Sequence, residues 1–80
     1  QEAYGISGTG NALKQNVAQN NMGTGFLITG DGNKLTGNRA ASSNSEGFVV
    51  NGNDNKFSGN DSLDNTGNGW LIAGNGNKFI

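Results

Sequence analysis

The side chains that could carry out chemistry in this chain of 80 residues are few and dispersed. Six are acidic, and no His or Cys occurs. The chain therefore lacks the commonest general base and metal ligand, and it can form no disulfide or thiolate metal site. The acidic residues are Glu2, Asp31, Glu46, Asp54, Asp61 and Asp64.

Asp31 and Asp54 are the two acids that come nearest to a calcium pair. Calcium takes 6–8 oxygen ligands, several of them carboxylates, and two carboxylates supply a small part of that set. We therefore expect no metal site, no cofactor and no catalytic residue.

The basic residues show a clearer pattern. Lys34, Lys56 and Lys78 follow one another at a constant interval. Such a row could bind an acidic polysaccharide such as alginate or pectin, or it could only keep one face soluble. The formal charge of −1 argues against a nucleic acid, which requires a basic face. The longest apolar run, Trp70 to Ala73, is too short to cross a membrane.

The interval between these lysines applies to nearly the whole chain. The segment 25–35 reappears as 47–57 and as 69–79, and an earlier copy covers residues 4–13. A repeat at a fixed period of about 22 residues is typical of solenoids and related arrays. We expect one module over residues 1–80, with repeats at about 3–24, 25–46, 47–68 and 69–80.

Within a copy, apolar residues alternate with a period of two, as in Phe26 and Ile28, which indicates strands. Clusters of Gly and Asn, which favour turns, separate these short runs. We place strands near 26–29, 34–36 and 39–41, and at the equivalent positions of the other copies. Stacked coils of such strands make a right-handed parallel β-helix with three short sheets and about 3.6 coils.

Equivalent positions of the coils then form columns along the axis. We expect stacked rings inside the coil, and amide ladders at the corners, where Asn also tolerates a left-handed backbone. The aromatic column contains Tyr4, Phe26, Phe48 and Trp70. The Asn columns contain Asn11, Asn33, Asn55 and Asn77, and Asn16, Asn38 and Asn60.

The two ends of such a stack expose strand edges and apolar side chains. Because the sequence shows no cap before Tyr4 or after Phe79, we expect further coils of a parent chain, copies stacked end to end, or lateral association. Leu27, Val49 and Leu71 alternate with inward residues and should point outward, where they form either a lateral contact or ordinary surface.

Two motifs resemble a known family: Asn-x-Leu-x-x-Asn, at Asn33 to Asn38, and Gly-aromatic-x-Ile, at Gly25 to Ile28. Over roughly residues 4–80 they are similar to the right-handed β-helix repeats of the pectin-lyase-like superfamily, of the carbohydrate-binding and sugar-hydrolase type. The resemblance implies a scaffold that meets polysaccharides in an extracellular or periplasmic location. It also implies clustered Asp and His residues for hydrolysis, which this chain lacks.

The leading functional prediction is a non-catalytic structural or carbohydrate-contacting module that belongs to a longer or self-associating protein. One alternative is a fragment of a polysaccharide lyase or mannuronan epimerase, and another is the subunit of a self-assembling filament. Function has to be argued from a site and not from the fold. The first interpretation is favoured because the scaffold is regular and the sequence shows no group of residues suited to catalysis.

Overall fold

The computed structural model describes residues 2–80, and for Glu2 its backbone alone. Eleven strands and no helix make up this part of the chain, and they form three sheets. The first sheet contains β1 (Glu2–Ser7), β4 (Thr24–Thr29), β7 (Phe48–Asn51) and β10 (Trp70–Ala73). The second contains β2 (Ala12–Lys14), β5 (Lys34–Thr36), β8 (Lys56–Ser58) and β11 (Lys78–Phe79). The third contains β3 (Val17–Gln19), β6 (Arg39–Ala41) and β9 (Asp61–Leu63).

All neighbouring strands are parallel, and every pair keeps the register that the repeat predicts. Phe26 lies opposite Phe48, Leu35 opposite Phe57, and Ala40 opposite Ser62. The predicted β-solenoid with three parallel sheets is confirmed, and the strands predicted near 34–36 and 39–41 have the predicted bounds. The strand predicted at 26–29 begins two residues earlier, at Thr24.

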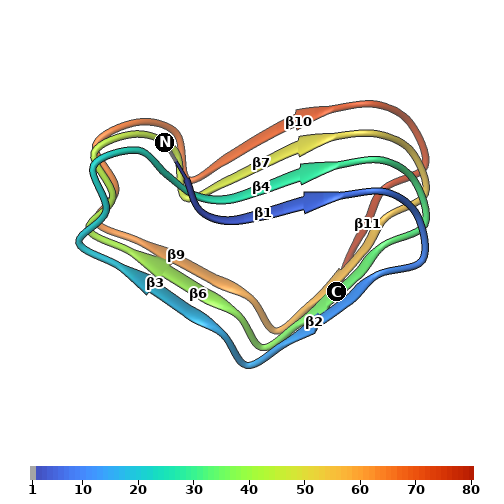
Figure 1. Cartoon of the computed structure of the whole chain (residues 1–80), viewed down its shortest axis with the longest axis horizontal. Helices are drawn as coiled ribbons and strands as arrows, with labels where there is room; N and C mark the ends of the chain where they lie inside the picture. Colours follow the sequence, from blue (N-terminus) through green and yellow to red (C-terminus); the bar gives the residue numbers. More distant parts are fainter. Residues whose placement is uncertain (1) are drawn as a thin grey trace.

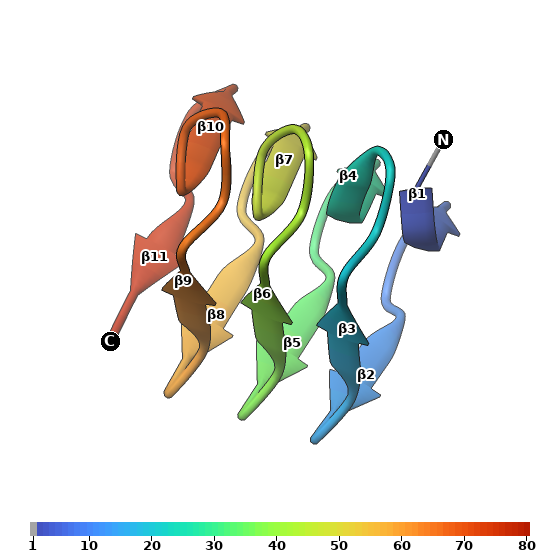
Figure 2. The same cartoon turned by 90° about the vertical axis from the view of Figure 1, so that its left-hand side faces the viewer.

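The solenoid is right-handed. In Figure 1 the chain runs clockwise, from β1 through β2 and β3 to β4. Figure 2 shows the coils side by side. The coil that contains β1 is nearest the viewer of Figure 1, and the coil that contains β10 is farthest away. A chain that turns clockwise while it recedes is right-handed, in agreement with the general rule for parallel crossovers.

The core consists of the inward-facing columns. Phe26, Ile28, Phe48 and Val50 are fully buried, whereas Leu27 and Val49 between them are partly exposed. The ring centroids of Tyr4 and Phe26, and of Phe26 and Phe48, are 4.8 Å apart, and those of Phe48 and Trp70 are 4.1 Å apart. The predicted aromatic ladder is therefore present, and each offset pair adds about 0.5–1.5 kcal/mol beyond burial.

The corners differ from the prediction in one respect. None of the seven predicted ladder asparagines has a positive φ. Instead the residue immediately before each ladder position of the middle coils is left-handed, as at Gly32 (φ 67°), Gly37 (φ 67°) and Asp54 (φ 56°). The expectation that the ladder asparagines themselves adopt the left-handed turn is wrong, because their side chains are directed into the coil to bond the backbone.

Two glycines of one turn, Gly30 and Gly32, offer a matched test of the coil-to-coil approach. A Cβ on Gly30 (φ 127°) would overlap the carbonyl oxygen of Gly8 in the preceding coil, whereas a Cβ on Gly32 would have no atom of the described chain within 4 Å. Gly32→Ala should cost only the left-handed strain of about 1–2 kcal/mol. Gly30→Ala should cost more than about 3 kcal/mol, the upper end of ordinary overpacking.

Urea unfolding followed by the fluorescence of Trp70 measures both variants, and equal loss of stability in the two would contradict the tight coil contact.

Candidate functional site

The lysine row lies on the second sheet. Lys34, Lys56 and Lys78 begin β5, β8 and β11, and each lies opposite the next in register. All three side chains are exposed, because they alternate with the inward column of Leu35, Phe57 and Phe79. The structure therefore places the three predicted residues in one line along the axis.

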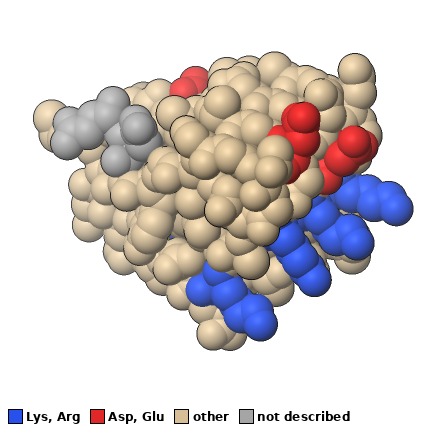
Figure 3. Space-filling model, turned by 45° about the vertical axis from the view of Figure 1, so that its right-hand side comes forward, with Lys and Arg blue, Asp and Glu red and all other residues tan. Residues whose placement is uncertain are grey.

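Figure 3 shows the basic side chains along one side of the molecule, with acidic side chains beside one end of the group. Lys14 is also exposed, but it lies opposite Thr36 and so belongs to a different column. The first position of the lysine column is Ala12. The row thus presents one cation in each of three successive coils.

An asparagine fixes the backbone just before each lysine. The N–H groups of Lys34, Lys56 and Lys78 donate to the backbone oxygens of the asparagines in the preceding coil at 2.8 Å. The ladder side chains then tie these corners together. The Nδ2 of Asn55, for example, donates to the oxygen of Gly30, and its Oδ1 accepts from the N–H of Asn33 at 2.7 Å. The backbone that carries each lysine is therefore held to the neighbouring coil by hydrogen bonds.

Both predicted asparagine ladders are present. In each, the N–H of one asparagine donates to the Oδ1 of its mate in the next coil over 2.7–2.9 Å. Each later member also donates from Nδ2 to a carbonyl in the preceding coil. Asn33, Asn38 and Asn55 are about 1% exposed. Because a buried amide without partners is costly, these bonds maintain the corners.

A third ladder was not predicted. At the third corner the N–H of Ser43 donates to the Oδ1 of Asn65 at 2.9 Å, and the Nδ2 of Asn65 donates to the oxygen of Ala40. The preceding member is Asn21, so Ser43 interrupts the column. The signal was a spacing of five, since Asn11, Asn16 and Asn21 mark the three corners of the first coil.

Asp31 and Asp54, the two acids nearest to a calcium pair in the sequence, have separate structural roles. The Oδ1 of Asp31 accepts the N–H of Asn53 at 2.7 Å, as a cap between coils. Asp54 occupies a left-handed corner position. Among the side chains of residues 3–80 the structure brings together no group of three or more His, Cys, Asp or Glu that could hold a metal ion.

Comparison with protein-family models, curated proteins and solved structures gave no match. The assignment to the pectin-lyase-like superfamily therefore stays a prediction that rests on the repeat motifs.

The described residues contain no helix of the length and apolarity that a bilayer span needs.

The interrupted third ladder gives a prediction about stability. The Oγ of Ser43 and the Nδ2 of Asn21 are buried without a hydrogen-bond partner among the described residues. An asparagine at position 43 would supply the Oδ1 that Asn21 lacks, so Ser43→Asn should stabilise the fold by about 0.5–1.5 kcal/mol. Urea midpoints measure this gain.

Two further substitutions serve as controls. Ser43→Ala removes a hydroxyl without a partner and should change stability little, whereas Asn38→Ser breaks an intact ladder and should cost about 1–3 kcal/mol. Loss of stability in Ser43→Asn, together with an unchanged Asn38→Ser, would contradict the ladder's role.

Proposed function

We propose that the chain is a non-catalytic β-solenoid module of an extracellular or periplasmic protein, and that its lysine row contacts an acidic polysaccharide. The observation that carries the proposal is the register of Lys34, Lys56 and Lys78, which aligns exposed cations in one line along the axis. A linear polymer with a carboxylate on each sugar offers a series of anions to such a row.

The electrostatics of the row favour a polyanion over a single small anion. Neighbouring cations at about 4–5 Å repel each other by up to about 1 kcal/mol in water, and an acidic polymer laid along the row relieves this repulsion at every step. One contact of this kind is weak and is screened by salt. Several contacts on one rigid line add up through effective concentration.

The net charge of the chain makes the proposal specific. With a formal charge of −1, the molecule as a whole does not attract a polyanion. Binding must therefore come from a local surface, and Figure 3 shows basic side chains gathered along one side of the molecule.

Single lysine substitutions test the row. Lys56→Gln removes the middle cation and should weaken binding to polygalacturonate or alginate severalfold, because one contact is lost and the two that remain no longer form a continuous line. Lys14→Gln removes the same charge outside the row and should change binding much less. Calorimetry at low and at high salt measures both variants, with neutral dextran as the polymer control.

Equal effects of the two substitutions would show that only the net charge of the protein matters. Binding to neutral dextran would show that the carboxylates of the polymer are not needed. Either result overturns the lysine row as the contact surface.

The same mixtures test the non-catalytic part of the proposal. A lyase acting on a uronan leaves a 4,5-unsaturated sugar that absorbs in the ultraviolet. We expect no rise in absorbance, and a rise that scales with protein concentration would establish the enzyme alternative.

A further inference from the structure

The chain contains a single acceptor sequence for an N-linked glycan, Asn60-Asp61-Ser62. Such acceptors have the form Asn-x-Ser or Asn-x-Thr and normally lie on surface loops of secreted proteins. Here the acceptor instead leads into a strand, because β9 begins at Asp61. The direction of its side chains therefore decides whether a glycosylating enzyme can reach it.

The two side chains that define the acceptor point toward the inside of the solenoid. Successive side chains of a strand alternate between its two faces, so Asn60 and Ser62 share one face and Asp61 lies on the other. Asp61 is exposed and lies opposite the exposed Arg39. Ser62 lies opposite Ala40, which is fully buried. The acceptor amide and the hydroxyl thus both belong to inward columns.

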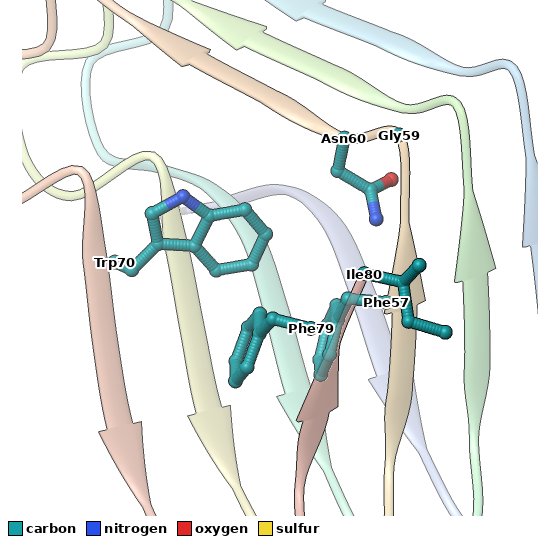
Figure 4. A pocket seen from close by; sticks show the side chains of 6 residues that line it. All are labelled: Phe57, Gly59, Asn60, Trp70, Phe79 and Ile80. Carbon is teal, nitrogen blue, oxygen red and sulfur yellow. The ribbon is translucent and has the colours of Figure 1, made fainter.

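Hydrogen bonds to the preceding coil hold the amide of Asn60 in place. Its Oδ1 accepts from the N–H and the Nδ2 of Asn38 at 2.8 and 3.1 Å, and its Nδ2 donates to the oxygen of Leu35 at 3.0 Å. Figure 4 shows the Asn60 side chain directed into the hollow that Phe57 and Phe79 also line. Asn60 is only half-buried, so its bonding masks it more than its cover does.

The hydroxyl of Ser62 is held just as firmly. Its Oγ donates to the oxygen of Gly69 and accepts from the Nδ2 of Asn65, each at 2.9 Å. A Cβ on Gly47 would overlap this Oγ, which shows that the hydroxyl is packed against the backbone of a neighbouring turn. An enzyme that reads Asn-x-Ser therefore finds both of its recognition groups engaged.

Glycan transfer requires the amide to leave these partners. The Nδ2 of the acceptor loses a proton and forms a bond to C1 of the sugar. The bond between C1 and the oxygen of the lipid pyrophosphate breaks, and the pyrophosphate leaves with the electron pair. For this reaction the Nδ2 of Asn60 has to leave the oxygen of Leu35 and turn out of the coil, which requires the corner before β9 to open.

We infer that Asn60 accepts an N-linked glycan only before the chain folds, and that this modification and the ladder of Asn16, Asn38 and Asn60 exclude each other. An unfolded chain takes the glycan, and folding withdraws the acceptor. The inference does not rest on polysaccharide binding. It applies in any compartment that contains the transferase and its lipid-linked oligosaccharide.

The order of folding and enzyme addition tests the inference. Translation into microsomes that contain an oligosaccharyl transferase and its lipid-linked donor presents the chain unfolded, and Asn60 should be modified. The same enzyme, solubilised and added to the purified folded chain, should leave Asn60 unmodified. Mass spectrometry of the peptides measures occupancy, and Asn60→Gln should abolish the signal. An unmodified chain after translation would show that Asn60 is no acceptor.

An exposed acceptor in the same chain provides the matched control. Met22→Thr completes an Asn-x-Thr sequence that begins at Asn20, in the loop between β3 and β4. Asn20 is exposed and Met22 is 75% exposed, and the same column holds a threonine at Thr66. In the folded variant Asn20 should be modified and Asn60 should not. Equal occupancy of the two positions, whether both are modified or neither, would overturn masking by the fold.

A destabilised variant tests the link to folding. Gly30→Ala weakens the coil contact in another corner and leaves the acceptor sequence intact. Modification through an open form follows the population of that form, so occupancy of Asn60 should rise about tenfold per 1.4 kcal/mol of lost stability. The glycosylated chain, in turn, should lack the urea transition of Trp70 fluorescence. Unchanged occupancy in Gly30→Ala, or a glycosylated chain with the urea midpoint of the unmodified one, would contradict the exclusion.

Discussion

The in-register stacking of equivalent residues in successive coils is the constraint on which the whole molecule depends. Each inward side chain packs on its own column mate, so ring lies on ring and amide on amide. A slip of one residue would turn Lys56 into the core and Phe57 into solvent, because the side-chain period of a strand is two. The sheets, the ladders and the lysine row are consequences of one register.

The corners maintain this register by hydrogen bonding. Each ladder asparagine of the middle coils bonds the N–H of one mate and a carbonyl of the preceding coil, so it joins two coils at two points. The left-handed residue before it turns the chain, and the asparagine then holds the turn. Small hydrophobic cores supply little stability. Here each column contributes one side chain per coil to the core, and the repeated amide hydrogen bonds add to the stability that this core supplies.

Much of the fold could be predicted because the repeat converts sequence spacing directly into contacts. The strands, the aromatic column from Tyr4 to Trp70 and both pure Asn columns followed from the period alone. The third corner was missed because Ser43 breaks the column between Asn21 and Asn65. The positive φ expected of glycines such as Gly30 and Gly32 is present, but the left-handed backbone expected at the ladder asparagines themselves is not, because the residue before each of them takes that conformation and varies in type, from Gly32 to Asp54.

The position of the candidate site could be predicted from the sequence, but the ligand that it binds could not. Outward positions such as Lys56 are free of packing constraints, so the sequence indicates that they share a line without indicating what binds there.

Nuclear Overhauser contacts in the unmodified chain test the register most directly. The account predicts that the ring protons of Phe48 show contacts to those of both Phe26 and Trp70, and that the side-chain amide of Asn55 shows contacts to Asn33 and Asn77. Contacts of Phe48 to the sequence neighbours of Phe26 and Trp70 in place of these two rings, or an absence of contact between Phe26 and Phe48 in the folded chain, would contradict it.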